Sequence, residues 1–381
     1  DPNDGTGWDL NAVSAHESTV HRSVEVEYWV VDDRGRLVEP DGLVEASSGA
    51  EREFVEPLLE VKTTPCATTA ELRDELFDRL ERILQRADGL GLRLVPLGTP
   101  VYADDIPDLP SDRTTVQDRV LGADFEYVRH CAGTHIHVEQ EPGHEVDQLN
   151  TLVALDPALA LVNSSPYFRG RRVAEGARSQ LYRRRAYDDL PHQGRLWRYV
   201  TDVDEWTRRL ERRYEAFVTR ALDAGIDHRT VTSCFSPESA IWTPVQLREQ
   251  FGTVEWRSPD AALPSQVVRL ADSLVGVVDT AVDAGIRIEA DAGEVSADSV
   301  VLPAFETVLE HVDDAIGQGL ESDAVRSYLD RMGFEVDAFD PITRDIGGRA
   351  PVDAAEARRL RLEYAERLER DVHRTRSINA D

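Results

Sequence analysis

Four short segments place ionisable side chains at alternate positions, as in strands with one charged face. They are residues 24–28, 59–62, 133–138 and 253–257. Because successive side chains of a strand point to opposite faces, each segment can bury apolar residues on one face and present Glu, His, Lys or Arg on the other. If the four strands share one sheet, the charged face is unfavourable unless multiply charged ions bind there. Divalent metal ions are the expected ligands.

The residue types on this predicted face favour Mg²⁺ or Mn²⁺ over structural zinc, because oxygen donors outnumber nitrogen donors. An arginine two residues after a ligand can bind a phosphate oxygen with a fork of donors. Together the side chains indicate a site that holds a triphosphate by its metal ions and neutralises a phosphoryl group during transfer. The pairs on the face are Glu25 with Glu27, Glu60 with Lys62, His135 with His137, and Glu255 with Arg257.

No glycine-rich phosphate loop accompanies these residues. Neither Gly-x-x-x-x-Gly-Lys-Ser/Thr nor a helix-opening Gly-x-Gly-x-x-Gly occurs, and Gly347-Gly348 is too weak a signal. If ATP binds, metal ions and arginines must hold it.

The elements that must position this face predict an α+β fold with a largely antiparallel sheet, because strands and helices alternate without a regular βαβ rhythm. Thr68 and Glu71 form a capping-box pattern at the start of one helix, which Gly89 or Gly91 ends. We expect a leader (1–20), a single catalytic domain (21–375) and a frayed tail (376–381), with an ordered functional loop at 167–200. The strand that contains the first charged segment is expected to cover 23–31, and a further strand is expected at 92–98. Helices are expected at 68–89, 115–131, 146–162, 203–224, 264–285, 299–318 and 353–376.

The composition is strongly acidic, with 72 Asp and Glu against 43 Lys and Arg, a net charge of −29, and Lys62 as the only lysine. Such a surface predicts a protein working in concentrated salt, where a Debye length of about 3 Å weakens self-repulsion. The charge disfavours nucleic acid as a partner. No apolar run reaches membrane-spanning length and residues 1–11 lack a signal-peptide pattern, so we expect a cytoplasmic protein without membrane partners.

Three cysteines lie far apart, which argues against a disulfide framework or a cysteine zinc site; they are Cys66, Cys131 and Cys234.

Other functions are compatible with the same residues. A metallohydrolase could use His135 and His137, although carboxylates outnumber imidazoles at the proposed site. A non-catalytic binding protein could carry a solvated acidic sheet, since surface ion pairs contribute little energy. Four charged strands in one chain favour the metal site, because the other interpretations must explain each strand separately.

The motifs resemble those of the glutamate–cysteine ligase family, including its bacterial carboxylate–amine ligase branch. They occur in the family's order over residues 20–265. The matching segments are 24–32, 58–66, 133–138, 163–179 and 241–260.

The resemblance implies a glutamine-synthetase-like fold in which the concave face of an antiparallel sheet carries the metal ions. It implies that ATP phosphorylates the γ-carboxylate of glutamate and that the amino group of cysteine then displaces phosphate, giving γ-glutamylcysteine. The substrates would be small molecules (glutamate, cysteine and ATP), with Mg²⁺ or alternatively Mn²⁺, and a homo-oligomer is compatible with this.

The resemblance also assigns residues by motif. Arg257 resembles the residue that stabilises the transferred phosphoryl group, and Arg178 resembles a contact to ATP phosphates or the acyl phosphate. His137 and Glu56 are expected to support the site structurally. The expected metal ligands are Glu25, Glu27, Glu60, His135 and Glu255.

Three departures leave the accepting amine open. Ser23 replaces a usual glycine, Pro65 is displaced by one position, and Gln246 stands where many bacterial members have arginine. The alternative is a ligase that joins glutamate to a different amine.

Overall fold

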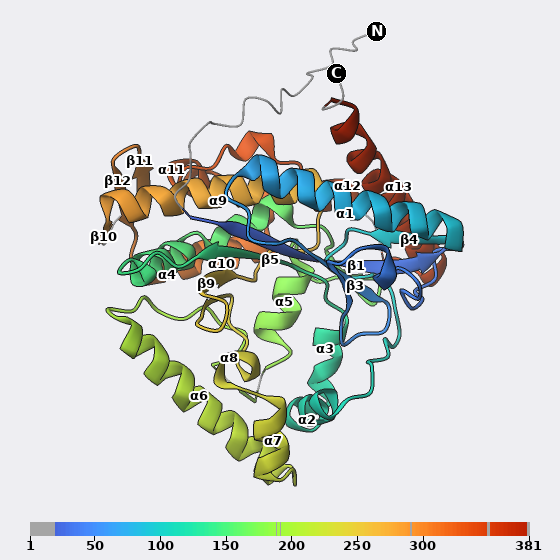
Figure 1. The fold of residues 1–381 in the computed structure, drawn as a ribbon, viewed down its shortest axis with the longest axis horizontal. Coiled ribbons are helices and arrows are strands. Elements are labelled where there is room, and N and C mark those ends of the chain that lie inside the picture. Colours follow the sequence, from blue (N-terminus) through green and yellow to red (C-terminus); the bar gives the residue numbers. More distant parts are fainter. Residues whose placement is uncertain (1–19, 188, 191, 290–291, 349–350, 379–381) are drawn as a thin grey trace.

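The centre of the molecule is a seven-stranded sheet, seen nearly edge-on in Figure 1. The computed structural model describes residues 20–187, 189–190, 192–289, 292–348 and 351–378. Every strand pair in this sheet is antiparallel, as predicted. The strand order is β2 (Ala50–Arg52), β3 (Leu58–Lys62), β1 (Arg22–Asp32), β5 (Thr134–Glu139), β9 (Thr253–Trp256) and β8 (Val245–Arg248), and β4 (Leu92–Val95) pairs with β1.

The strand register brings the charged positions of the four segments onto one face. Glu25 lies opposite Lys62 on β3 and opposite His135 on β5. Glu27 lies opposite Glu60. Directly opposite residues of an antiparallel pair share a face. The register therefore places acids from separate parts of the chain side by side.

One face of the sheet is covered by long helices, α1 (Thr69–Leu90), α9 (Pro264–Ala284) and α13 (Ala354–Ile378) (Figure 1). In α1, the Thr68 side chain accepts from the Glu71 backbone N–H, and Gly91 ends the helix in the left-handed conformation at φ 67°. This confirms the predicted capping box. The main hydrophobic core lies between the sheet and these helices.

A second group of helices lies on the other side of the sheet (Figure 1). Its side chains form a separate apolar cluster that includes Val116, Leu210 and Phe217. The second group of helices therefore lies on the side of the sheet that carries the charged face. They are α2 (Asp112–Leu121), α3 (Phe125–Arg129), α5 (Ala177–Arg184), α6 (Val203–Asp223), α7 (His228–Cys234) and α8 (Pro237–Ala240).

The other elements connect these layers or pack at their edges. Helix α4 (Glu145–Ala154) packs on α9 and on strands β8 and β9. Two small sheets are separate from the central one. The remaining bounds are η2 (Val44–Ala46), η3 (Gly122–Asp124), η4 (Asp156–Val162), β6 (Tyr167–Phe168), β7 (Arg171–Arg172), β10 (Ile286–Ile288), β11 (Glu294–Ser296), β12 (Ser299–Leu302), α10 (Phe305–Gly317), η5 (Gly319–Glu321), α11 (Asp323–Arg331), η6 (Val336–Ala338) and α12 (Thr343–Ile346).

Three expected helices were wrong in extent. The helix at 115–131 is interrupted at Gly122, whose φ of 62° is incompatible with a continuous helix. The helix at 146–162 is α-helical only to Ala154 and continues as a 3₁₀ segment, because Pro157 has no backbone N–H to donate. Residues 299–302 form β12, and α10 begins after Pro303.

The expected chain ends fall largely outside the described residues. Of the predicted leader only Val20 is described, and of the predicted tail residues 379–381 lie outside. Within the described ranges, no helix combines the length and apolar character that crossing a membrane requires.

Candidate metal and phosphoryl-transfer site

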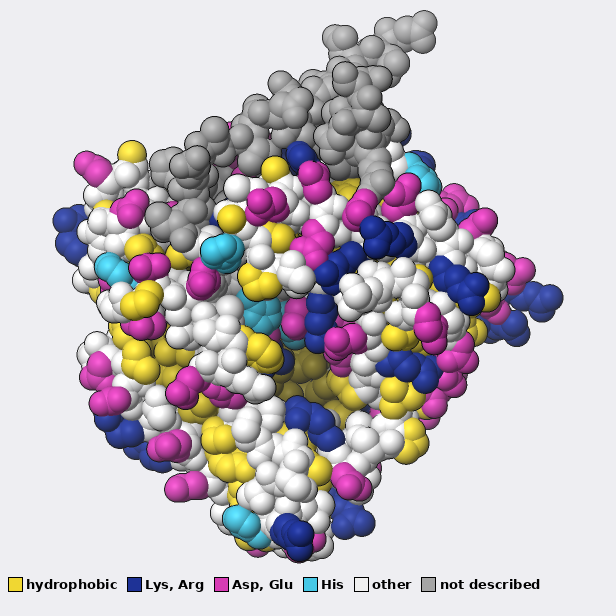
Figure 2. Space-filling view, viewed as in Figure 1, with side chains coloured by type: hydrophobic (Ala, Val, Ile, Leu, Met, Phe, Trp, Pro, Cys, Tyr) yellow, Lys and Arg dark blue, Asp and Glu magenta, His cyan; other side chains and the backbone are white. Residues whose placement is uncertain are grey.

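A cavity of about 460 Å³ lies between the charged face of the sheet and the second group of helices. Figure 2 shows the hollow near the centre of this side of the molecule, with hydrophobic side chains deep inside it and charged side chains near its edge. Seven residues predicted to act at the site or support it line this cavity. They are Glu25, Glu27, Glu60, His135, His137, Glu255 and Arg257.

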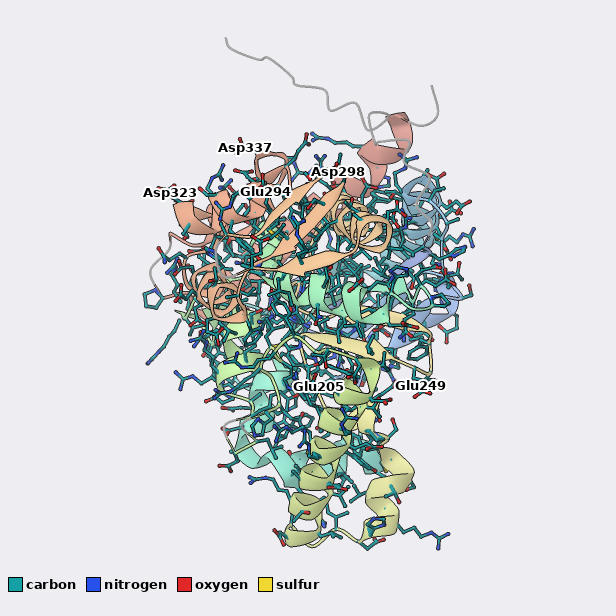
Figure 3. The ribbon with its side chains drawn as sticks, turned by 90° about the vertical axis from the view of Figure 1, so that its left-hand side faces the viewer. Glu205, Glu249, Glu294, Asp298, Asp323 and Asp337 are labelled. Atoms are coloured by element: carbon teal, nitrogen blue, oxygen red, sulfur yellow. The ribbon has the colours of Figure 1, made fainter. Side chains whose placement is uncertain are left out.

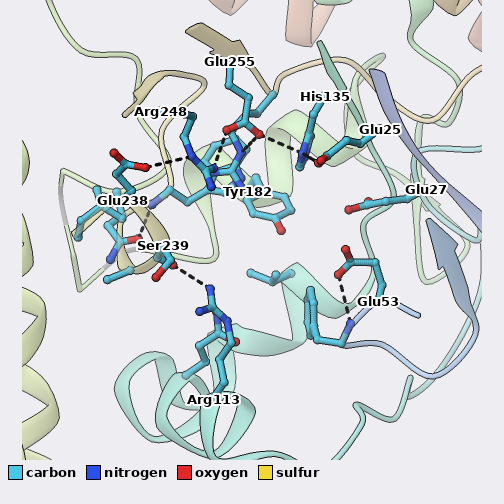
Figure 4. A pocket seen from close by; sticks show the side chains of 18 of the residues that line it. Glu25, Glu27, Glu53, Arg113, His135, Tyr182, Glu238, Ser239, Arg248 and Glu255 are labelled. Carbon is cyan, nitrogen blue, oxygen red and sulfur yellow. Dashed lines mark hydrogen bonds and ion pairs between the residues drawn. The ribbon is translucent and has the colours of Figure 1, made fainter. Parts of the chain in front are cut away.

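The first ligand group consists of Glu25, His135 and Glu255, from β1, β5 and β9. One ligand atom from each lies within 4.8 Å of those of the other two. Nδ1 of His135 is 3.3 Å from Oε2 of Glu25 and 3.2 Å from Oε1 of Glu255 (Figure 4). The imidazole therefore lies between two carboxylates.

Basic neighbours keep this first group ionised. Burial opposes ionisation of Glu255, but Arg257 and the hydrogen bond with His135 hold the pKa of Glu255 below its usual range. Burial likewise opposes charge on His135, but Glu25 and Glu255 raise the pKa of His135 to about 9. Nη1 of Arg248 adds a contact of 2.7 Å to Oε2 of Glu255.

His137 also faces the first group. Its Nε2 is 3.7 Å from an oxygen of Glu25 and 3.7 Å from an oxygen of Glu255. Its Nδ1 lies 3.0 Å from the hydroxyl of Thr253, which fixes the ring orientation. The structural role expected for His137 stays a prediction.

The second ligand group consists of Glu27, Glu53 and Glu60, whose ligand oxygens also lie within 4.8 Å of one another. Burial, together with the neighbouring Glu27, raises the pKa of Glu53 to about 7. Burial, with Glu53 and Glu25, raises the pKa of Glu60 to about 8. A divalent cation placed among these carboxylates would favour their ionised form.

Lys62 forms an ion pair with Glu60 of the second group. Its Nζ is 2.7 Å from Oε2 of Glu60, 3.2 Å from Oε2 of Glu51 and 3.7 Å from Oε1 of Glu25. Burial would lower the pKa of Lys62, but the carboxylates of Glu60 and Glu25 raise it above its usual value. The ammonium group is therefore charged and touches both ligand groups.

Arg257 lies on the same face as Glu255 and lines the cavity. Its Nε is 3.2 Å from Oε1 of Glu255, and its guanidinium carbon lies 5.6 Å from the Trp242 ring centroid. Gln246 is fully buried and is not among the lining residues; its Oε1 lies 3.5 Å from Nη1 of Arg257, and its Nε2 donates to the Glu238 carbonyl. Gln246 therefore contacts Arg257 from a buried position outside the cavity lining.

Arg178 lies behind the cavity wall rather than among its lining residues. It is 2% exposed, and its Nη1 donates to the backbone carbonyls of Arg257 and Ser258 at 3.1 and 3.0 Å. A Cβ on Gly133 would lie 2.1 Å from Nη2 of Arg178, so the guanidinium requires glycine there. The predicted contact of Arg178 with a phosphate stays a prediction; in this structure Arg178 fixes the backbone that carries Arg257.

The wall opposite the sheet is largely aromatic and apolar. Arg113, on α2, ties this wall together by donating to the carbonyls of Cys234 and Ser239 (Figure 4). Tyr182 stacks on Trp242 with ring centroids 4.4 Å apart. The apolar and aromatic lining residues are Phe54, Leu121, Val128, Tyr182, Tyr187, Phe217, Ala240, Ile241 and Trp242.

The site differs from the sequence prediction at two residues, Glu56 and Glu53. Glu56 does not line the cavity; it lines a different, smaller pocket with Pro57 and Ile106. Glu53, which follows β2, takes a place in the second ligand group and was missed. The alternation of Glu51 and Glu53 was the available signal, but no strand pattern continues past Glu53.

Sequence comparison assigns the family. The profile of Glutamate-cysteine ligase family 2 (GCS2) matches residues 22–300. The chain belongs to this family. Two relatives are the "Putative glutamate--cysteine ligase 2-1" of Rhodococcus jostii, 34% identical over 40% of this chain, and the "Putative glutamate--cysteine ligase 2" of Jannaschia sp., 28% identical over 63% of it. The matches span 43% and 60% of those proteins, so the chain covers less than two thirds of either relative.

Solved structures show the same fold at low sequence identity. The glutamate–cysteine ligase of Francisella tularensis in complex with AMP matches with a TM-score of 0.56 and 14% identity, covering 93% of this chain and 89% of that one. A bifunctional glutathione synthetase from Pasteurella multocida matches with a TM-score of 0.54 and 14% identity. The match covers 93% of the present chain and 52% of the Pasteurella chain.

Proposed function

We propose that the protein is an ATP-dependent carboxylate–amine ligase that joins the γ-carboxylate of glutamate to the amino group of cysteine. The products would be γ-glutamylcysteine, ADP and phosphate. The observation that carries the proposal is the meeting of two carboxylate-rich ligand groups and Arg257 in one cavity of a family 2 fold. The AMP bound by the Francisella ligase supports a nucleotide substrate.

The side chains fit divalent metal ions. Six residues supply five carboxylates and one imidazole, the donor set that Mg²⁺ or Mn²⁺ accepts. Burial and neighbouring carboxylates raise the pKa values of Glu53 and Glu60, which supports a place for a bound cation beside the second group. When bound, the ions would neutralise triphosphate oxygens and orient the γ-phosphate.

The proposed reaction has two steps. An oxygen of the glutamate γ-carboxylate attacks the γ-phosphorus of ATP, ADP leaves, and an acyl phosphate forms. The amino nitrogen of cysteine then attacks the acyl carbon, the carbon–oxygen bond to phosphate breaks, and the nitrogen loses a proton. The first step turns an unreactive carboxylate into a better acyl donor, the acyl phosphate. The second step uses this acyl phosphate to form the amide bond.

Arg257 is the residue we assign to the phosphoryl group. Its guanidinium is held by Glu255 and Gln246 on one side and lines the cavity on the other. A fixed, permanently charged fork of donors stabilises the charge of the transferring group without reorganisation. Arg178 would act as a positioning residue, because it binds the carbonyl of Arg257 itself.

A second candidate keeps ATP and glutamate but changes the amine. The opposite wall presents aromatic rings, among them Tyr182, Phe217 and Trp242, and such a surface suits an acceptor larger than cysteine. Gln246 does not reach the cavity, so the departure from arginine at that position removes a potential contact to the acceptor.

Acidic residues occur on many elements, which supports the expectation of a salt-rich environment. Figure 3 labels six that belong to separate parts of the chain: Glu205, Glu249, Glu294, Asp298, Asp323 and Asp337. The assay should therefore be run in molar KCl, where surface repulsion is screened.

One assay separates the candidates. The protein receives ATP, Mg²⁺ and glutamate, then each amino acid or amine in turn, while ADP and phosphate are measured and the product is identified by mass. Turnover that requires cysteine supports the first proposal, and turnover that requires another amine supports the second. Absence of amine-dependent ADP release with any acceptor would refute both, and phosphate release from simple esters without ATP would favour a metallohydrolase.

A further inference from the structure

Lys62 occupies an unusual position for the only lysine of the chain. Its Nζ contacts Glu60 of the second ligand group at 2.7 Å and Glu25 of the first at 3.7 Å. It also contacts Glu51, which does not line the cavity, at 3.2 Å, and the Glu51 side chain is 58% exposed. One ammonium group thus joins both ligand groups to a carboxylate outside them.

The two ligand groups differ in the basic side chains that form ion pairs with them. Glu255 of the first group pairs with Arg248 and Arg257. Among the described residues, Lys62 is the one basic side chain that forms an ion pair with the second group. Lys62 is therefore the cationic partner of Glu60 in the second group in this structure.

We propose that Lys62 is an exchangeable counterion: it takes the place of a divalent cation beside Glu60 and withdraws toward Glu51 when a metal ion binds. This rests on the metal site of the proposed function. An ammonium at 2.7 Å from Oε2 of Glu60 occupies the side of the oxygen where a cation would bind, so the two cannot share that oxygen in the same geometry.

The geometry supplies the second position of the exchange. Lys62 has a flexible four-carbon stem, its side chain is 32% exposed, and Glu51 is already within contact distance. A shift to Glu51 keeps the ammonium paired, so metal binding does not leave an isolated charge. Binding of the ion is then an exchange of cations rather than a simple addition.

Replacement of Lys62 by methionine tests this on the full chain without ATP. Titration calorimetry with Mn²⁺ at fixed KCl should show a dissociation constant for Lys62→Met lower by about tenfold or more, because a competing positive charge within 4 Å is gone. Lys62→Arg keeps the charge and serves as the matched control, with affinity near that of the unchanged protein. Equal or weaker binding by Lys62→Met would overturn the proposal.

A second measurement does not depend on the variant folding without metal. Because Lys62 is the only lysine, protein grown with lysine labelled with ¹³C at Cε gives a single lysine side-chain signal. Titration with Mg²⁺ should shift this signal to a new position as the ammonium leaves Glu60. A signal unchanged at saturating Mg²⁺, with binding shown by calorimetry, would overturn the proposal.

Glu51→Gln tests the outer position. In the otherwise unchanged protein, Glu51→Gln should weaken Mn²⁺ binding, because the displaced ammonium of Lys62 loses its partner. In the Lys62→Met background, Glu51→Gln should leave the Mn²⁺ affinity unchanged. An equal loss in both backgrounds would show that Glu51 acts independently of Lys62 and would refute the withdrawal. If no variant binds Mn²⁺, the metal site of the proposed function fails as well, whereas binding that is indifferent to Lys62 refutes only this inference.

Discussion

The two ligand groups lie side by side on one sheet yet differ in charge balance. Glu25 and Glu255 of the first group stay ionised because His135 and two arginines neighbour them. Glu53 and Glu60 of the second group have raised pKa values because burial and mutual repulsion outweigh Lys62. The protein's own charges balance the first group, whereas we propose that a bound cation balances the second. This difference predicts distinct responses to mutation, metal and pH.

The largest effect is expected from Glu255→Gln, which breaks the balanced group. Glu255 contacts His135, Arg248 and Arg257 at once, so its loss would remove a proposed metal ligand and an ion-pair partner of the arginine that we assign to the phosphoryl group. We expect kcat/KM for ATP-dependent ligation to fall on the order of 10²-fold or more. Glu249→Gln, an exposed glutamate before β9, is the matched control and should keep full activity (Figure 3). Normal turnover of Glu255→Gln would exclude it from the mechanism.

Glu53→Gln tests the group that needs an ion. It removes one of three clustered carboxylates and their repulsion, so we expect the Mg²⁺ concentration for half-maximal rate to rise about tenfold, with a smaller change in kcat. Glu56→Gln, three residues away and outside the cavity, is the control. Equal Mg²⁺ dependence of the two variants would contradict the assignment of Glu53 as a ligand.

Gln246→Leu should have a smaller effect, because Gln246 acts through Arg257. Its amide oxygen faces a guanidinium nitrogen at 3.5 Å, so its loss loosens Arg257 without removing charge. We expect kcat to fall by roughly threefold to tenfold while KM for glutamate is unchanged. Steady-state kinetics at saturating ATP measures this. A raised KM for the accepting amine would instead place Gln246 in contact with that substrate.

The smallest effect is a pH dependence of stability without metal. The folded-state pKa values of Glu53 and Glu60, about 7 and about 8, exceed the usual 4.5. Between pH 4.5 and these folded-state values, the folded protein therefore binds more protons than the unfolded chain. Stability should therefore fall as pH rises through this window. The first group acts oppositely, because the lowered pKa values of Glu25 and Glu255 make their contribution disappear as pH falls below 4.5.

Thermal melts between pH 5 and 8, in EDTA and in Mg²⁺ at constant KCl, measure this dependence. The increase of Tm caused by Mg²⁺ should grow with pH, because the ion requires ionised carboxylates. Glu60→Gln should flatten the decline seen in EDTA. A decline of the same slope in Glu60→Gln and in the unchanged protein would contradict the assigned cause.

The predictability of the fold varies with the range of the interactions involved. The helix beginning after Thr68 was predicted correctly because its capping box is a local signal. The helices around Gly122 and Pro157 were extended too far, because apolar periodicity continued across residues whose backbone chemistry interrupts an α-helix. Within the site, Glu53 follows the end of a three-residue strand, so period-two alternation could not select it over Glu56.

The sequence by itself determined which face each charged side chain of the four strands takes, because alternation is a property of the extended backbone. It also identified the residue types that suit a divalent cation and a phosphoryl group. Only the tertiary structure decided which side chains meet, because register and strand order bring Glu27 opposite Glu60 and Glu25 opposite both Lys62 and His135. Charge balance was likewise a tertiary outcome, since burial and neighbouring charges from distant segments set the ionisation of each carboxylate.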